Sequence, residues 1–276
     1  MSKKTFTQRR KGAKTPVRSA KDMTTRRRFY APPATFALDE QTIKLSSDET
    51  KHARNVLRLQ NGDEVYVFDG EGHEYRCRLA AYDRDAARLD LIEQVEPARA
   101  ESSLNLTLAV ALLKGEKFDL VVQKATELGA WRVVPVVTER ADVRIRDANE
   151  AKRKTERWQR IALEATKQCG RARLMEIEAP GAFESLIKAP GSDRELRLMF
   201  AERDGTSLTG LVAGLASRPE QVFALVGSEG GWTDDEISQA RDFHWNLVTL
   251  GGRTLRAETA AIAIAALLQH AFGDLV

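Results

Sequence analysis

Two segments of the sequence each join an apolar strand to a helix through a glycine-rich loop. In the first, residues 222–226 are apolar, Gly227, Gly230 and Gly231 follow, and Thr233-Asp234-Asp235-Glu236 has the pattern of a capped helix start. Glycine tolerates positive φ and the close approach of a ligand, and amides at a helix start face polar groups. An ordinary strand-to-helix loop is the alternative, but this density of glycine favours a ligand loop. The loop matches neither a P-loop nor a dinucleotide fingerprint.

The second segment runs from Leu250 through Gly251 and Gly252 to the start of an apolar helix at residue 257. Arg256 and Glu258 lie at the mouth of that helix, where packing does not explain them. The alternative for Glu258 is a favourable place near the positive end of the helix dipole. Arg256 gains nothing from that dipole, so we predict that it contacts a ligand or a partner.

Alternating strands and helices are predicted around these two loops. Apolar stretches indicate strands, and apolar residues at helical spacing indicate helices. The strands are expected at residues 104–113, 133–138, 196–201, 222–226 and 247–250, and the helices at 116–128, 155–169, 233–243 and 257–272. This alternation predicts an α/β domain with a mostly parallel sheet, in which the apolar helix 257–272 is largely buried.

An earlier region of the chain has a different rhythm. Ser46-Ser47-Asp48-Glu49 predicts a short capped helix through residue 57, and turn residues then separate apolar stretches at 65–68, 75–81 and 89–95. Short strands between turns predict a small β-barrel over residues 29–96. Residues 96–103 are polar and are interpreted as the linker.

Basic residues are concentrated in two places. Residues 1–28 carry eleven Lys or Arg and one Asp, so the remaining body has 32 basic and 39 acidic residues. This tail is interpreted as a disordered extension, as a basic arm that adds salt-dependent affinity for phosphates, or, less favoured, as a transit peptide. Residues 152–173 hold eight basic residues and two acids, which favours a phosphate-binding patch over a merely solvated helix face.

Several classes of protein are excluded by composition. No apolar run is long enough to span a membrane, and the N-terminus lacks the pattern of a secretory signal. Cys77 and Cys169 are therefore expected to be reduced thiols in a cytoplasmic protein. The four histidines form no ligand-spaced cluster with cysteine, so we predict no metal site.

Taken in order, the motifs resemble the SPOUT superfamily and, within it, the uridine-N3 methyltransferases of 16S ribosomal RNA. The resemblance covers nearly everything after residue 22. It rests on the following segments: Met23 to Tyr30, His52-Ala53-Arg54-Asn55-Val56-Leu57-Arg58, Lys114-Gly115-Glu116-Lys117, Gln123 to Gly129, Glu164 to Arg171, Gly227 to Gly231 and Leu255 to Ala260. One departure is Ser228, where the family commonly has proline, whose preset φ would stiffen the loop.

The resemblance implies a fold and an assembly. It predicts a basic disordered extension at residues 1–22, a PUA-like β-barrel RNA-binding domain at 23–97, and a SPOUT α/β methyltransferase domain with a trefoil knot at 98–276. It also implies a cytoplasmic homodimer that acts on 16S ribosomal RNA within the assembled small ribosomal subunit.

The resemblance also implies the cofactor, S-adenosyl-L-methionine, and the residues that contact it. The expected cofactor residues are Phe200, Ala201, Val226, Gly227, Glu229, Gly230, Gly231, Leu250, Gly251, Leu255 and Ala260. For the transfer of methyl to uridine N3, Arg256 is the expected stabiliser of the uridine anion and Glu164 the expected base, while Glu258 or Glu229 is expected to orient Arg256.

RNA contacts are expected from both domains. The implied residues are His52, Arg54, Asn55, Arg58, Lys114, Lys124, Arg157, Gln168, Arg171 and Arg173. For His52, spacing alone would favour an ordinary surface histidine. Three alternatives to the function stay open: a SPOUT methyltransferase with another base or a ribose 2′-oxygen as target, a non-catalytic ribosome-assembly factor, and an unrelated nucleotide-binding α/β protein.

Overall fold

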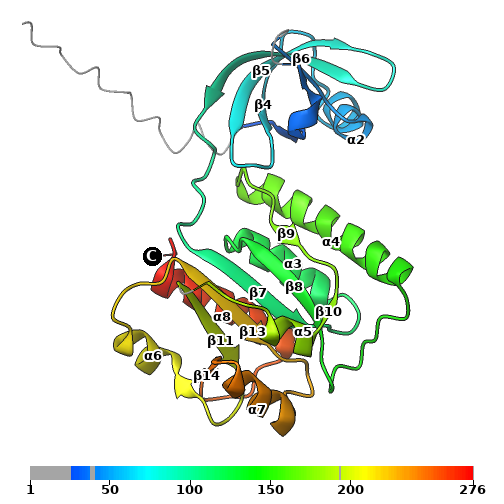
Figure 1. Ribbon diagram of the computed structural model, residues 1–276. Helices are drawn as coiled ribbons and strands as arrows, with labels where there is room; N and C mark the ends of the chain where they lie inside the picture. The colour runs from blue at the N-terminus through cyan, green and yellow to red at the C-terminus, as the bar shows by residue number, and fades with distance from the viewer. Residues whose placement is uncertain (1–25, 38–40, 193, 276) are drawn as a thin grey trace, which may run out of the picture.

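The computed structural model describes residues 26–37, 41–192 and 194–275, which form two domains stacked one above the other (Figure 1). The predicted extension, residues 1–22, lies outside the described residues. An irregular stretch without helix or strand connects the two domains at residues 96–104, where the polar linker was predicted.

The first domain is a curled sheet around its own apolar core. Its elements are β1 (Arg28–Tyr30), β2 (Phe36–Ala37), β3 (Thr42–Lys44), α2 (Ser47–Lys51), a π-helical segment (His52–Val56), β4 (Glu64–Phe68), β5 (Glu74–Tyr82) and β6 (Ala87–Val95). The strand order is β1-β4-β5-β6-β3-β2, and only the β1–β4 pair is parallel. The predicted helix forms because the hydroxyl of Ser46 accepts a hydrogen bond from the amide of Glu49.

The second domain is an α/β sandwich. Its strands are β7 (Asn105–Ala111), β8 (Arg132–Val137), β9 (Glu176–Ile177), β10 (Gly181–Ala182), β11 (Glu195–Phe200), β12 (Thr206–Ser207), β13 (Gln221–Val226) and β14 (Asn246–Thr249). Its helices are α3 (Lys117–Glu127), α4 (Ala148–Cys169), α5 (Phe183–Lys188), α6 (Leu208–Gly214), α7 (Asp234–Asp242) and α8 (Ala257–Phe272).

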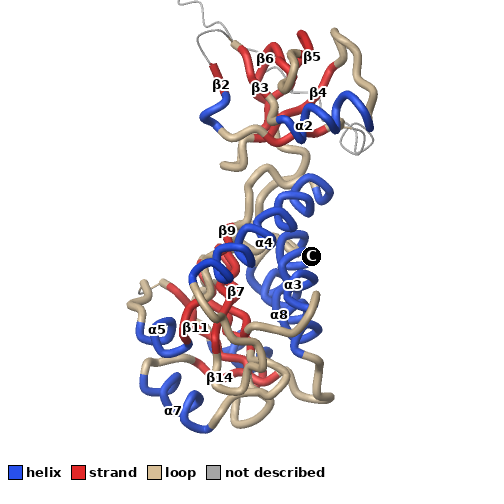
Figure 2. Tube along the Cα trace, turned by 90° about the vertical axis from the view of Figure 1, so that its right-hand side faces the viewer, coloured by secondary structure: helices blue, strands red, loops and turns tan. Residues whose placement is uncertain are grey.

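The sheet is parallel at every pairing, as predicted, in the order β10-β8-β7-β13-β11-β14-β12, with β9 beside β8. One face packs on α3, α8 and Trp158 of α4, and the other packs on α5 and α7. Figure 2 shows α3 and α8 on one side of the strands and α5 and α7 on the other. Parallel strands covered on both faces place their carboxyl ends at one edge, where ligands of open α/β sheets bind.

Helix ends follow local chemistry. The predicted capping box at Thr233 and Glu236 is present and starts α7. Helix α4 begins seven residues earlier than predicted, because the carboxylate of Asp147 caps it, and it ends at Gly170 with φ of 91°. Helix α8 has the predicted bounds but is not buried all round: Leu267 is 41% exposed.

The two domains are joined by buried ion pairs at the end of α4. Arg28 pairs with the fully buried Glu74 and donates hydrogen bonds to the carbonyls of Thr166, Lys167 and Arg171. Lys167 in turn pairs with Glu49 of α2 at 2.8 Å. The first domain therefore supplies the cation that satisfies the last carbonyls of α4, which fixes one domain on the other.

Candidate active site

The two glycine loops meet in one cavity of about 550 Å³. It opens where β11, β13 and β14 end, and both loops and the residues after Phe200 line it. Of the eleven residues predicted to contact the cofactor, ten lie on its wall: Phe200, Ala201, Val226, Gly227, Gly230, Gly231, Leu250, Gly251, Leu255 and Ala260. The eleventh, Glu229, does not. The size suits a small organic ligand, and the wall combines apolar side chains with backbone amides.

Loop 227–232 is held by close packing against Trp232. The indole Nε1 donates a hydrogen bond of 2.9 Å to the carbonyl of Phe200. A Cβ on Gly227 would lie 3.1 Å from the indole ring, so a larger residue would push the ring away. The side chain that fixes the end of β11 thus also explains why glycine stands at 227.

Arg140 fastens the same loop from the segment that follows β8. Its guanidinium donates to the carbonyls of Gly230 at 3.3 Å and Trp232 at 3.0 Å. A Cβ on Gly230 would lie 2.9 Å from the Cβ of Arg140 and 3.0 Å from its carbonyl oxygen. Next to it, the amide of Glu139 donates to the carboxylate of Glu236. Arg140 is not predicted from the sequence, because nothing nearby in sequence marks it.

Loop 250–256 is held much more loosely. Gly251 and Gly252 have φ of 67° and 72°, which favours glycine at both positions. Residues 251–256 are all exposed. Within the described part of the chain, neither the side chain of Arg253 nor that of Arg256 makes a hydrogen bond, an ion pair or a ring contact. Arg256 is the N-cap of α8 and lies beside the cavity, outside its wall.

An ionic cluster flanks the cavity next to Arg256. The ammonium of Lys117, at the start of α3, lies 2.7 Å from Glu229 and 3.9 Å from Glu258. The hydrogen bond that Lys117 donates to Glu229 raises the pKa of Lys117. Burial acts to raise the pKa of Glu229. The hydrogen bonds from Lys117 and from the backbone, together with the charge of Lys117, have the larger effect, so the pKa of Glu229 lies below its ordinary value. Among the described residues, neither Glu229 nor Glu258 pairs with Arg256, which one of them was expected to orient; both carboxylates pair with Lys117 instead.

Glu164, the expected base, does not lie on the wall of the cavity. It lies on α4, its side chain is 70% exposed, and it contacts Lys167. It lines a separate groove of about 1100 Å³ between α3 and α4. Within one chain, the fold therefore does not bring Glu164 to the cavity.

Several of the predicted RNA residues do lie together in that groove between α3 and α4. Lys124, Arg157 and Gln168 line it with Arg160. Two of the cations are partly neutralised, because Lys124 pairs with Glu127 and Arg157 with Asp119. The remaining cation, Arg160, has no ion pair among the described residues.

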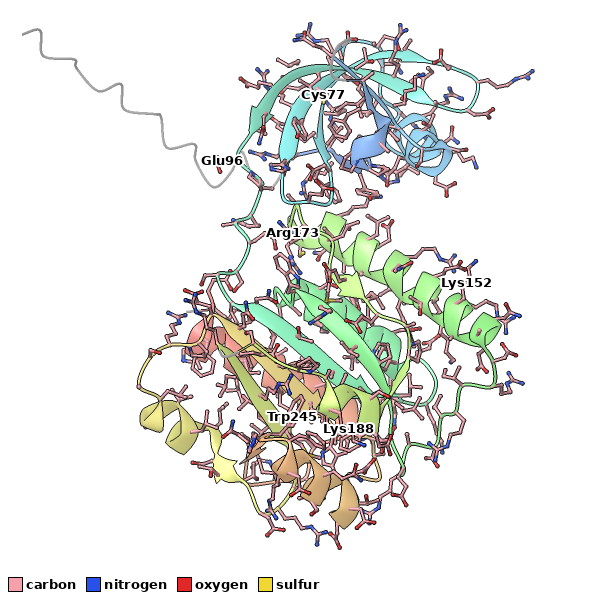
Figure 3. All side chains as sticks on the ribbon, viewed as in Figure 1. Cys77, Glu96, Lys152, Arg173, Lys188 and Trp245 are labelled. Atoms are coloured by element: carbon pink, nitrogen blue, oxygen red, sulfur yellow. The ribbon has the colours of Figure 1, made fainter. Side chains whose placement is uncertain are left out.

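Arg171 is not available as an RNA contact. Its side chain is only 6% exposed, pairs with Glu101, and donates to the carbonyls of Thr126 and Ala130. The basic residue predicted to bind phosphate instead anchors the linker to the second domain. By contrast, Arg173 stacks over Trp131 at 4.3 Å and stays partly exposed near the junction of the domains (Figure 3). Lys114 is exposed and pairs with Asp142.

The motif at residues 52–58 has an unusual backbone. Its first part is a π-helix, which is a rare conformation in proteins. Arg58 has a positive φ of 52°, which is uncommon for a residue other than glycine. Arg54 stacks over Tyr82, Asn55 and Arg58 are exposed, and Val56 is 65% exposed. His52 is half-buried, with its ring edge toward Phe29.

The cavity also fits the implied cofactor in its polar groups. Ser228 lines the cavity, and its buried hydroxyl has no hydrogen-bond partner among the described residues. A buried hydroxyl without a partner is costly, and a polar ligand would satisfy it. Among the described residues, no cluster of three or more His, Cys, Asp or Glu has the geometry to hold a metal ion, and no helix is long and apolar enough to span a membrane.

Comparisons with known proteins give the class and then the family. Residues 100–269 match the RNA methyltransferase domain, and residues 45–92 match the RNA methyltransferase PUA domain. The class is thus an RNA methyltransferase with an added PUA domain. Over 221 residues, covering 80% of this chain and 70% of the relative, the sequence is 36% identical to ribosomal RNA small subunit methyltransferase E of Synechocystis sp..

A Bacillus subtilis protein of the same name is 30% identical over 80% of this chain and 87% of its own length. A crystal structure of ribosomal RNA small subunit methyltransferase E from Neisseria gonorrhoeae, bound to S-adenosyl methionine, superposes with a TM-score of 0.79 at 30% identity, covering 91% of this chain and 100% of the other. The chain belongs to the ribosomal RNA small subunit methyltransferase E family.

Proposed function

We propose that the protein methylates N3 of a uridine in 16S ribosomal RNA with S-adenosyl-L-methionine bound in the cavity of the two glycine loops. One observation carries the proposal: loops 227–232 and 250–256, separated in sequence by α7 and β14, line a single cavity at the carboxyl edge of a parallel sheet. Family membership and the cofactor-bound Neisseria structure support it.

The chain's own groups suit an adenosine and a charged methionine tail. Leu250, Leu255 and Ile264 offer apolar surface for a flat ring, and the amides of the glycine loops offer donors. Ser228 adds an unsatisfied hydroxyl. When bound, the cofactor supplies an electrophilic methyl group at its sulfonium.

Methylation at N3 would form a carbon–nitrogen bond while the methyl–sulfur bond of the sulfonium breaks. Because N3 must also lose its proton, negative charge builds up on the uracil ring until the methyl group is transferred. Arg256 is the group we assign to that charge, because it lies beside the cavity, is cationic and exposed, and its side chain has no partner among the residues that the structure describes. We assign the proton to bulk water, since the 251–256 loop is open to solvent. Glu258 is assigned a supporting role through Lys117.

The RNA is proposed to follow the side of the molecule on which α2 and α4 lie (Figure 2). Helix α4 spans about 33 Å at the ordinary helical rise. Figure 3 places Arg173 near the first domain and Lys152 at the far end of α4. The segment before α4 carries Arg140 to the cavity, so this route leads from residues 52–58 to the active site.

We further propose a cytoplasmic homodimer, with domains at 23–97 and 98–276 and the trefoil knot that the resemblance implies. Helices α3 and α8 pack together and expose Leu120 and Leu267, which suits a second copy. The assembled small ribosomal subunit is the proposed substrate.

The proposal is tested by incubating the purified protein with S-adenosyl-L-methionine and either small subunits or naked 16S RNA from cells that lack the modification. Nuclease digestion and mass spectrometry should show 3-methyluridine at one position, with subunits preferred. A ribose methylation or another methylated base would contradict the N3 target, and no modified nucleoside with either substrate would contradict the enzymatic proposal.

A further inference from the structure

Lys117 lies between two carboxylates that belong to the two glycine loops. Glu229 comes from loop 227–232, and Glu258 is in the first turn of the helix that follows loop 250–256. Lys117 itself comes from the start of α3, more than a hundred residues away. One cation thus joins three segments at the edge of the cavity.

Arg256 is next to this cluster and is left out of it. It is two residues before Glu258, and its charge is near enough to oppose the protonation of Lys117. Yet it forms no ion pair with any described residue, although two carboxylates are close by. Lys117 donates a hydrogen bond to Glu229 and lies 3.9 Å from the buried Oε2 of Glu258, which accepts no hydrogen bond from the described residues.

We propose that Lys117 is a positioning residue: it engages Glu229 and Glu258 and so keeps the guanidinium of Arg256 free for the anionic acceptor base. This inference rests on the proposed function for the identity of the acceptor, but the pairing itself is a property of the free protein. Without Lys117, two carboxylates and one arginine would remain, and the attraction between them would turn Arg256 away from the acceptor.

The pairing is tested by chemical modification of the full-length protein. Phenylglyoxal labels free guanidinium groups, and peptide mass spectrometry gives the labelling rate at each arginine. Lys117→Met should slow the labelling of Arg256 by about threefold, the size expected of an ion pair at a surface. Arg253, exposed and unpaired in the same loop, is the internal control and should keep its rate. An unchanged rate at Arg256 would overturn the proposal.

A second variant tests whether Lys117 keeps Arg256 free of the carboxylates or only links α3 to the two loops. Lys117→Met/Glu229→Gln removes the nearer carboxylate as well, and should return the labelling of Arg256 toward the wild-type rate. In methylation assays Lys117→Met should lower kcat by about tenfold, with the dissociation constant of S-adenosyl-L-methionine nearly unchanged, and the double variant and Lys117→Arg should regain most of it. A double variant as slow in labelling as Lys117→Met would contradict the proposal.

The two readouts also distinguish this inference from the proposed function. If the wild-type protein methylated no uridine, the proposed function would fail, while the labelling of Arg256 would still decide the pairing. Thermal unfolding of each variant identifies any that fail to fold.

Discussion

The two glycine loops of the active site differ in how the protein holds them. Loop 227–232 is fixed by its own Trp232, whose indole donates a hydrogen bond to the end of β11, by Arg140, which donates to loop carbonyls, and by Lys117, which pairs with Glu229. Loop 250–256 is exposed, and its two arginines have no partner among the described residues. The same β-strand-to-helix arrangement thus gives one preset loop and one open loop.

This difference indicates that the two loops have different roles. A fixed loop loses little conformational entropy when a ligand binds, so it suits the cofactor. An exposed loop with free cations can adapt to a large anionic substrate and meet charge that develops during the reaction. We therefore expect changes in the first loop to alter cofactor affinity and changes in the second to alter turnover.

The largest effect is expected for Arg256→Ala. Turnover should fall by about 100-fold or more, the size of losing a charge-stabilising donor, while the dissociation constant of the cofactor should change by less than about twofold. Single-turnover methylation and calorimetry measure the two quantities. Arg256→Lys keeps the charge and should recover part of the rate. Near-normal turnover of Arg256→Ala would remove the open loop from the chemistry.

Gly230→Ala should act on the fixed loop. Its Cβ would meet the backbone of Arg140, so the loop must shift and cofactor affinity should fall by about tenfold, which corresponds to roughly 1.4 kcal/mol. Gly214→Ala at the end of α6 is the matched control, because a Cβ there meets no atom within 4 Å. Equal cofactor affinity of the two variants would show that loop 227–232 is not preset by packing.

Arg140→Ala should have a smaller effect of the same kind. It removes two hydrogen bonds to loop carbonyls, but its side chain is exposed, so we expect about threefold weaker cofactor binding. Arg146→Ala is the control in the same segment, because among the described residues the side chain of Arg146 pairs with Glu150 alone; this variant should keep the wild-type affinity for the cofactor, measured by calorimetry. If both variants bound alike, Arg140 would not fasten the loop.

The contrast between fixed and free cations continues along α4, where the smallest effect is expected. Arg160→Ala should weaken RNA binding by about twofold to threefold and reduce the salt dependence by about one ion. Fluorescence anisotropy at several salt concentrations measures both quantities. Arg241→Ala, on the opposite face of the sheet, is the control for net charge. Identical salt slopes for the two variants would remove Arg160 from the RNA route.

The local sequence pattern predicts most of the helices and strands. The site residues that it does not predict depend on pairing between residues that are far apart in sequence. The bounds of α8 and the strands that lead into both glycine loops follow from apolar periodicity and capping residues, which neighbours in sequence decide. The burial of Arg171 depends on Glu101, and the role of Lys117 on Glu229, 70 and 112 residues away. Charge counting along α4 cannot separate Arg171 from Arg160, because only their partners differ. For the same reason, nothing near Glu164 in sequence shows that, within one chain, it lies in the groove between α3 and α4 and not on the cavity wall.

The proposed function requires both loops to hold the same methyl donor. Amide hydrogen exchange with and without S-adenosyl-L-methionine tests this requirement directly. We predict that the cofactor slows exchange in peptides covering 226–232 and 249–256 together, while residues 52–58 keep their rates. Protection of only one of the two loops, or of neither, would contradict it.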